Sequence, residues 1–418
     1  MKTNFDLIII GAGPAGIAAA LSAARRGADT LLVERYGCVG GGMTSMYVRP
    51  FLGTVKNVNV GGEIEAAVTA LCDRMSPVEA AKCALTKLLH DAGVQVLLQS
   101  SLVGVGKDGR RIVSVTVSTQ SGTVELTAKQ FIDASGDGVL AALAGCTVEV
   151  GRDEDGLMQP TSLMFTIEGI EPWQTLICQH EEHYQQLTNG EEYLDLCHKA
   201  CASGELPSTV NIVRLYNTGR IGERMVNATQ LNRVNPLEPM HLFESEYQLR
   251  EQIHAVVDFL RNNIPGFADI RVNGSATTLG IRESRRVMGD YVLTADDLIE
   301  GRKFDDAVVH NACFCIDIHN PAGPGQAVAE EGCPKRAKPY DIPYRCLTPQ
   351  GFDNLLIAGR CISGTHEAHA SYRVMRICMG MGDAAGHAAV LAMQGDGITR
   401  NVDVHKIQKA VNIGEESR

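Results

Sequence analysis

The stretch LIIIGAGPAGIAAALSAARRGADTLLVE, residues 7–34, decides the fold. An Ile-rich apolar run typical of a buried strand opens it, and Gly11, Gly13 and Gly16 follow in the spacing G-x-G-x-x-G. An Ala-rich helix and a second apolar run, Thr30 to Glu34, complete the stretch. Strand, glycine turn, helix and strand in this order are the context in which the motif binds a dinucleotide. The sequence therefore predicts a dinucleotide site after the first strand.

Each part of this motif suits a dinucleotide for a physical reason. The glycines permit a tight turn and a close approach of the backbone to a pyrophosphate, and the helix N-terminus offers unpaired N–H groups to the same anion. Glu34 ends the second strand, where a carboxylate accepts hydrogen bonds from an adenosine ribose and disfavours a 2′-phosphate. A glycine-rich turn without a ligand is the alternative, which the surrounding pattern disfavours.

Composition and charge limit the class of protein. The chain has 418 residues, which predicts two domains, and its 44% hydrophobic and 21% charged residues are ordinary globular values. The net charge of −11 argues against a nucleic-acid partner. Thirteen cysteines without a framework spacing fit reduced thiols. We therefore expect a cytoplasmic protein.

An uncharged run at residues 7–24 has the length of a membrane span. Its three glycines, Pro14 and the turn that they form argue against a membrane helix. It is also a poor signal peptide, because only Lys2 precedes it and Asp6 interrupts the flank. We expect no membrane span.

The following patterns predict an α/β domain whose parallel sheet carries an antiparallel insertion. Helical spacing at 61–75 and 77–91 precedes three alternating segments between Ser101 and Lys129, separated by Gly-containing turns. FIDASGDG, residues 131–138, then returns to a buried strand that ends in small residues. Glycine-rich loops after parallel strands form the ligand crevice of such sheets.

A second small-residue loop, GGGMTS at residues 40–45, follows the first strand–helix–strand unit. Its small residues let the backbone approach a ligand, and its hydroxyls can bond a phosphate or a polyol chain. A flexible loop without a ligand is the alternative.

The middle of the chain, 159–339, has a different character and lacks a second dinucleotide turn. We interpret it as a mixed α+β block. The expected elements are strands at 162–168, 211–216, 224–228, 271–279 and 313–319, helices at 173–201, 241–263 and 294–300, and a loop at 320–338. Cys197 and Cys201 lie four residues apart, but nothing completes a four-ligand set, so we predict no metal site.

After residue 340 the sequence returns to the pattern of its N-terminal part, a buried strand followed by a helix of small apolar residues. NLLIA, residues 354–358, is a predicted buried strand, and the small apolar residues of 374–393 predict a helix packed closely on a sheet or a cofactor. The predicted domains are a cofactor domain in two parts, 1–158 and 340–400, a substrate domain at 159–339, and a C-terminal helix and tail at 401–418.

Together these motifs resemble the FAD-dependent oxidoreductases of the glutathione-reductase-like flavoprotein fold. They occur in the family's order along nearly the whole chain. They are GAGPAG, GGMT, IDASGDG, IRESRRV, YVLTADDLIEGRKFDDAV, IDIHNP, IPYRCLTP, NLLIAGRCISGTHEA and RVM. The resemblance implies an α/β FAD-binding Rossmann-like domain, with a parallel sheet and an inserted antiparallel meander, and an α+β substrate domain that caps the flavin.

The resemblance also implies a set of cofactor contacts. They are Gly11, Gly13, Ala15 and Gly16 at the pyrophosphate; Glu34, Arg35 and Val103 at the adenosine; Gly42, Met43, Thr44, Ala134, Gly136 and Asp137 along the phosphates and the ribityl chain; Gly359 and Arg360 near that chain; and Val374 and Met375 at the flavin N1–O2 edge.

The chain departs from its relatives at a few positions. Arg360 stands where relatives often have Asp, and Arg376 stands where proline is usual. His369 and Tyr372 replace small or aliphatic residues. We therefore expect the ribityl contact to differ in kind, and the resemblance does not identify the substrate.

Hydride exchange at flavin N5 requires the protein to orient a substrate and to manage one proton. The proton candidates are His319, His366, His369 and Tyr372, since an imidazole titrates near neutrality. A structural place in the core is the alternative for each histidine.

Arginines supply the cationic candidates. Arginine suits bidentate recognition of a carboxylate, so a substrate with an acid or oxyanion group is our hypothesis, with Arg282 at the site. An internal ion-pair cluster around Glu283 is the alternative, above all for Arg286. The further candidates are Arg285, Arg345 and Arg373.

The electron partner is left open. The missing second glycine motif and the missing Cys-x-x-x-x-Cys pair argue against a pyridine-nucleotide domain and against disulfide reduction. NAD(P)H, a quinone, oxygen or a redox protein remain, as do covalent attachment of FAD and a homo-oligomer. Our interpretation is an FAD-dependent oxidoreductase acting on a small molecule. An NAD-dependent dehydrogenase and a non-catalytic protein of the same fold are the alternatives.

Overall fold

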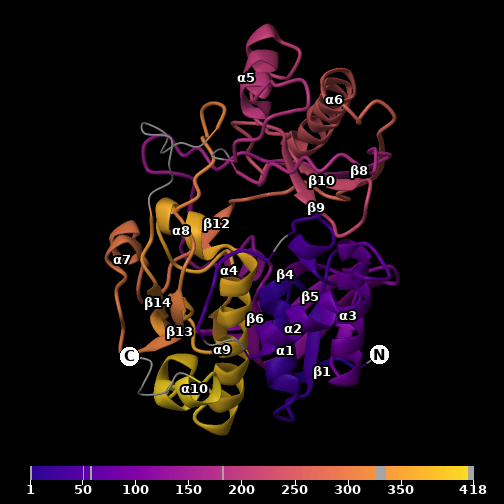
Figure 1. Ribbon diagram of the computed structural model, residues 1–418. Helices are drawn as coiled ribbons and strands as arrows, with labels where there is room; N and C mark the ends of the chain where they lie inside the picture. The colour runs from indigo at the N-terminus through magenta and orange to yellow at the C-terminus, as the bar shows by residue number, and fades with distance from the viewer. Residues whose placement is uncertain (1, 50, 57–58, 181–182, 326–335, 413–418) are drawn as a thin grey trace.

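The computed structural model describes residues 2–49, 51–56, 59–180, 183–325 and 336–412 (Figure 1). The predicted tail after residue 412 and most of the predicted loop at 320–338 lie outside these residues.

A seven-stranded sheet lies at the centre of the larger domain, in the order β3-β2-β1-β6-β5-β4, with β15 also paired to β6. Its parallel part joins β1, β2, β3, β6 and β15. The predicted parallel sheet with an antiparallel insertion is therefore confirmed. The strands are β1 (Asn4–Ile10), β2 (Thr30–Val33), β3 (Gln95–Leu97), β4 (Ser101–Asp108), β5 (Arg111–Thr119), β6 (Gly122–Asp133) and β15 (Leu355–Ile357).

Strand β6 belongs to both parts of this sheet. Its first half pairs antiparallel with β5, and its second half pairs parallel with β1. The separate strands expected before Lys129 and after Phe131 are therefore one strand, because no turn residue interrupts the chain between them. This continuity carries the end of β6 to the cofactor loop at Ala134.

Helices from the two ends of the chain lie side by side against this sheet (Figure 1). They are α1 (Pro14–Ala24) and α9 (Met375–Gln394). A Cβ at Gly382 or Gly386 would collide with the α1 backbone at Ala15 or Ala19, so glycine is what allows this approach. The two ends therefore share one core.

Further elements surround this core. They are α2 (Val60–Thr69), α3 (Pro77–Asp91), α4 (Val139–Ala144), α7 (Ala295–Glu300), α8 (His366–Tyr372) and α10 (Val404–Ala410), with the strand pairs β7 (Val148–Val150) with β12 (Arg285–Val287) and β13 (Ala307–Ala312) with β14 (Tyr340–Pro343). Thr294 and Asp297 form the expected capping box of α7.

Residues 163–281, which we call the cap, have a hydrophobic core of their own. Their antiparallel sheet has the order β11-β8-β10-β9 and lies between the cap helices and the larger domain (Figure 1). The cap elements are β8 (Phe165–Glu168), α5 (Tyr193–Ser203), β9 (Arg214–Asn217), β10 (Glu223–Asn227), α6 (Pro239–Asn263) and β11 (Arg271–Ser275).

The hydrophobic cores of the structure differ from the predicted domain boundaries at one point. Residues from Val287 to Ile318, placed with the middle block by sequence, pack in the core of the larger domain. Strand β13 pairs there with β14, which follows residue 339. The division into domains otherwise stays a prediction.

Two predicted elements of the middle block are wrong. The helix expected at 173–201 begins only at Tyr193, because an Asn189-Gly190 turn precedes it and Cys178 pairs with Leu215 as an isolated bridge. The strand expected at 313–319 is absent from the described residues apart from isolated bridge positions at Cys313 and His319, and the true strand is β13. Residues 314–318 instead form a loop, and Asp317 and His319 line the cavity described below.

The described helices include none with the length and apolar character needed to cross a bilayer. The uncharged run at residues 7–24 forms most of β1 and α1.

Candidate functional site

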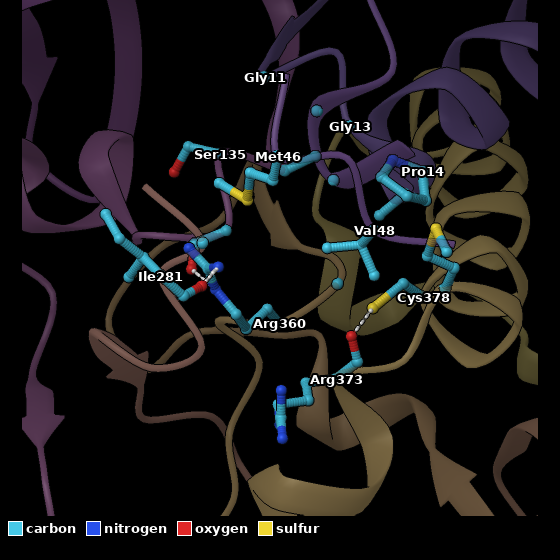
Figure 2. A pocket seen from close by; sticks show the side chains of 18 of the residues that line it. Gly11, Gly13, Pro14, Met46, Val48, Ser135, Ile281, Arg360, Arg373 and Cys378 are labelled. Carbon is cyan, nitrogen blue, oxygen red and sulfur yellow. Dashed lines mark hydrogen bonds between the residues drawn. The ribbon is translucent and has the colours of Figure 1, made fainter. Parts of the chain in front are cut away.

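A cavity of about 400 Å³ extends from the glycine turn after β1 to the inner face of the cap. Its volume falls in the usual range of small-molecule sites. Figure 2 shows Gly11 and Gly13 on one side of it and Arg373 on the opposite side. Segments distant in sequence therefore line one continuous space.

The first end of the cavity is lined by Glu34, Arg35 and residues 100–102. The buried Glu34 carboxylate accepts hydrogen bonds from the Ala12 N–H at 2.7 Å and the Tyr36 N–H at 2.9 Å. It thus fixes the glycine turn while still lining the cavity. Val103 is half exposed and lies just beyond the lining, so its backbone contact with adenine stays a prediction.

The glycine turn leaves room for a diphosphate. Gly11, at φ +98°, could not carry a side chain, because a Cβ would collide with the Ala134 carbonyl. A Cβ at Gly13 or Gly42 meets no protein atom within 4 Å, although both residues line the cavity. Helix α1 begins at the same place without a side-chain cap, so its first-turn N–H groups are available to an anion. These residues fit the diphosphate of FAD.

Several of the implied cofactor contacts lie behind the lining. A Cβ at Gly16 would collide with the Gly11 carbonyl, so Gly16 packs α1 on β1. Met43 is fully buried, and the Thr44 hydroxyl donates to the Val39 carbonyl at 2.8 Å. These residues support the lining, whereas Ala15, Gly42, Ala134 and Gly136 form part of it.

Asp137 is also behind the lining and joins three segments. Its carboxylate accepts hydrogen bonds from Arg35 at 3.1 Å, Ser284 at 2.7 Å and Arg360. Burial would raise the pKa of Asp137, but Arg360 and Arg35 hold it below its usual value. Asp137 is therefore an ionised support for the cofactor loops.

Arg360 explains the departure from the Gly-Asp pattern of relatives. It lines the cavity, and its guanidinium donates to the Ile281 carbonyl (Figure 2). The same group donates to the Gly136 carbonyl and to Asp137. The side chain therefore ties the loop after β6 to the segment that carries Arg282.

The start of α9 forms another wall of the cavity, with Val374, Met375 and Cys378. Val374 provides no side-chain cap, so the first N–H groups of this helix are available to a flavin. Burial raises the pKa of Cys378 to about 12, so its thiol is protonated and donates to the Arg373 carbonyl (Figure 2). Arg376 points elsewhere and pairs with Glu65 at 2.6 Å.

The cap end of the cavity is polar. Arg282, Asp317, His319 and Arg373 line it. Asp317 lies 3.5 Å from His319 Nε2 and 3.3 Å from Arg373 Nη2. Arg282 Nη1 donates to the Pro160 carbonyl at 2.7 Å.

Burial and neighbouring charges set the protonation of this group. Burial together with the Arg282 cation lowers the pKa of His319 to about 4, and burial together with Arg373 lowers the pKa of Arg282 to about 9. Burial opposes ionisation of Asp317, but His319 and Arg373 hold its pKa well below the usual range. At neutral pH the site therefore combines a neutral imidazole, a carboxylate and guanidinium cations.

Three catalytic candidates from the sequence do not line the cavity, which corrects that prediction. His366 contacts the buried Glu283 carboxylate at 2.9 Å, and the Tyr372 hydroxyl donates to the Ile362 carbonyl at 3.1 Å. The His369 ring packs edge-on against Tyr372, and burial lowers the pKa of His369 far below its usual value. Helix α8 directs these side chains into the core, so only His319 and Arg282 of the five candidates reach the cavity.

The other arginine candidates have structural partners. The fully buried Arg286 pairs with Glu283 and donates to the Gly151 and Gly364 carbonyls, as the ion-pair alternative predicted. Arg345 pairs with Asp306 at the surface, and Arg285 donates to the Asp137 carbonyl.

Sequence reasoning missed Asp317 and Gln159. The alternation of CFCIDIH was interpreted as a strand, although an Asp two residues before a His was a usable signal. Gln159 had no such signal. Its buried Oε1 accepts from Arg373 and from the His319 N–H, each at 3.3 Å, so it fixes two residues of the cap end.

Curated relatives match parts of the chain. A digeranylgeranylglycerophospholipid reductase from Picrophilus torridus is 30% identical over 159 residues, which is 32% of this chain and 40% of that protein. A thiamine thiazole synthase from Aeropyrum pernix is 31% identical over 148 residues, which is 31% of this chain and 54% of that protein. These matches cover less than two thirds of either relative's length.

Solved structures match nearly the whole fold. A geranylgeranyl bacteriochlorophyll reductase-like protein from Thermoplasma acidophilum aligns with 99% of this chain and 84% of its own at a TM-score of 0.50 and 13% identity. A flavoprotein/dehydrogenase from Cytophaga hutchinsonii aligns with 98% of this chain and 84% of its own at 0.50 and 14% identity. At these identities the likeness shows the fold alone.

A family model described as FAD dependent oxidoreductase matches residues 6–411. The match includes every segment of the cavity, from the glycine turn to α9. This family match argues against the two alternatives left by the sequence, an NAD-dependent dehydrogenase and a non-catalytic protein of the same fold. The chain belongs to the FAD dependent oxidoreductase family and is an FAD enzyme.

Proposed function

We propose that FAD lies along the cavity, with its adenosine at Glu34 and Arg35 and its diphosphate at Gly11, Gly13 and the α1 N-terminus. The flavin ring then meets the α9 N-terminus, and the substrate enters at the cap end. One observation carries this proposal: a single continuous cavity joins the glycine turn to His319 and Arg282. Bound FAD supplies hydride exchange at its N5.

His319 is the residue that we propose moves the proton. Its neutral imidazole can accept a proton from a substrate that loses a hydride, or return one in the reverse direction. Asp317, next to Nε2, orients the ring and leaves Nδ1 for the substrate.

The guanidinium groups of Arg282 and Arg373 support a substrate that bears a carboxylate or another oxyanion. Both groups line the cavity near His319. Arginine presents paired N–H donors that match a carboxylate. A substrate anchored in this way places its reacting carbon between the flavin and the imidazole.

Anaerobic mixing of the purified holoenzyme with a panel of small alcohols, amines and acids tests this function. We expect at least one acid to bleach the visible flavin absorbance, and we expect His319→Gln to slow the bleaching by about 100-fold or more, the usual contribution of a general base. His90→Gln is the matched control, because His90 is an exposed surface residue. Bleaching that is equally fast in His319→Gln contradicts the role of His319.

A further inference from the structure

Two uncharged polar side chains of the cap and its entry segment line the cavity. They are Ser162, which precedes β8, and Asn227, the last residue of β10. Their neighbours Leu163 and Val226 belong to the hydrophobic core of the cap. Because successive side chains along a strand point to opposite faces, Ser162 and Asn227 project away from that core and toward the cavity.

Ser162 lies next to the proposed substrate-binding arginine. Its backbone exchanges two hydrogen bonds with Gly280, at 2.8 and 3.3 Å. Two residues further along each segment, Arg282 donates to the Pro160 carbonyl at 2.7 Å. The segments that carry Ser162 and Arg282 therefore run side by side along the cavity.

Asn227 lies at the same end of the cavity. It is directly opposite Arg214 in the β9–β10 pair. The Arg214 charge contributes to lowering the pKa of His319 and of Arg282. A charge contributes in this way only when it lies near both groups. Asn227 therefore belongs to the cap end of the cavity and not to the glycine turn.

Both polar groups keep their hydrogen-bonding capacity for a ligand. Among the residues that the structure describes, neither the Asn227 amide nor the Ser162 hydroxyl has a hydrogen-bond partner. Gly280 keeps space beside the hydroxyl, because a Cβ at this position would lie 3.1 Å from Ser162 Oγ. A ligand that displaces water from these groups without bonding to them loses free energy, because it leaves them unpaired.

The chemistry of the two groups defines what they can bind. A carboxamide offers an acceptor oxygen and two N–H donors, and a hydroxyl both donates and accepts. Neither group carries a charge. Together they match a neutral group that also donates and accepts, which is a hydroxyl or a carboxamide. A carboxylate only accepts, and a methyl group does neither.

We infer that the substrate carries a neutral hydroxyl or carboxamide in addition to its acid group, and that Asn227 and Ser162 bind this neutral group. The inference rests on the proposed function and names a further feature of the substrate at the same site. Asn227 and Ser162 are thus specificity-determining residues, which select among the acids that Arg282 anchors.

Spectral titration of the holoenzyme with matched pairs of acids tests the inference. Within each pair, a hydroxyl replaces a methyl group or a carboxamide replaces an isopropyl group. The hydroxyl pairs are glycolate with propionate, hydracrylate with butyrate, and γ-hydroxybutyrate with valerate. The carboxamide pairs are malonamate with isovalerate and succinamate with isocaproate. Dissociation constants come from the perturbation of the flavin absorbance, measured without oxygen.

We expect the polar acid of at least one pair to bind about fivefold to tenfold more tightly than its apolar partner, as one neutral hydrogen bond implies. A site built to bond a hydroxyl or an N–H group discriminates against the analogue that lacks it, because the groups of the protein then stay unpaired. The pair with the larger ratio of dissociation constants identifies the neutral group. For an acid that bleaches the flavin, the concentration that gives half of the maximal bleaching rate replaces the dissociation constant.

Variants assign the preference to the two side chains. Asn227→Leu removes the amide at a similar side-chain volume, and we expect it to abolish most of the preference while the apolar acids bind as before. Ser162→Ala should reduce the preference by a smaller factor. Asn217→Leu is the matched control, because Asn217 is exposed on the neighbouring strand β9 and lies outside the cavity lining. Flavin content and thermal melting of each variant show that it has folded.

The outcomes separate this inference from the proposed function. Equal binding within every pair overturns the inference, as does a preference that both variants retain. Weaker FAD binding by Asn227→Leu also overturns it, because Asn227 would then face the cofactor. If no acid of the pairs perturbs the flavin, the inference fails, while bleaching by another compound leaves the proposed function intact. A holoenzyme whose flavin no compound in the earlier panel bleaches contradicts the proposed function itself.

Discussion

The two ends of the cavity recognise their ligands by different means. At the cofactor end the backbone provides most of the binding features. Glycines leave space for the ligand, and two helix N-termini without side-chain caps offer N–H groups. At the cap end, side chains from separate segments of the chain, Arg282, His319 and Arg373, define the chemistry. A backbone site depends on local sequence order, whereas a side-chain site depends on how distant segments meet.

The largest effect is expected from filling the space at the cofactor end. Gly13→Ala places a methyl group where no protein atom lies, so the chain should fold but bind FAD about 100-fold more weakly, a loss of roughly 3 kcal/mol. Equilibrium titration of the apoprotein with FAD measures this. Gly37→Ala is the control, because its Cβ would make an ordinary contact with Gln99. Undiminished FAD binding in Gly13→Ala would contradict the backbone site.

A change at the cap end should affect the substrate and spare the cofactor. Arg282→Gln removes a guanidinium from the cavity, and we expect kcat/KM for the acid found by screening to fall about 30-fold to 100-fold, typical of a lost charge-assisted contact. FAD affinity should stay within about twofold. Arg345→Gln, which alters a surface ion pair, should change neither quantity. If Arg282→Gln loses FAD instead, the two ends are not separable.

A change behind the cavity should affect stability and not chemistry. His366→Asn weakens a buried contact with Glu283, and we expect a loss of about 1–2 kcal/mol in the free energy of unfolding. Denaturant unfolding measures this loss, and the rate of flavin bleaching should remain that of the parent. A large fall in the rate of flavin bleaching, with an unchanged fold, would contradict this structural role and support a catalytic role for His366.

The smallest effect is a shift in pH dependence at the cap end. His319 acts as a base when it is neutral, so the acid limb of kcat/KM for substrate oxidation should appear as the pH falls toward the His319 pKa of about 4. Arg282→Gln removes the cation that contributes most to lowering this pKa, so the acid limb should move to higher pH. A pH–rate profile of both proteins checks the direction. A limb that does not move would place the Arg282 charge away from His319.

Individual elements show which parts of the fold and of the site could be predicted from the sequence. The glycine turn, the meander, α3 and the capping box of α7 follow from local patterns and lie where those patterns placed them. The part of the 173–201 helix before Tyr193 and the strand expected at 313–319 were wrong, because tertiary pairing overrode local spacing. His366, His369 and Tyr372 share a stretch with cavity residues, yet α8 directs them into the core.

By itself, the sequence determined the dinucleotide turn, the fold class and the family, because these depend on glycines, apolar runs and their order along one stretch after another. Only the tertiary structure decided which charged side chains meet at the cap end. Arg282, Asp317 and Arg373 come from three separate segments, and loop packing, which no local pattern encodes, brings them to one place.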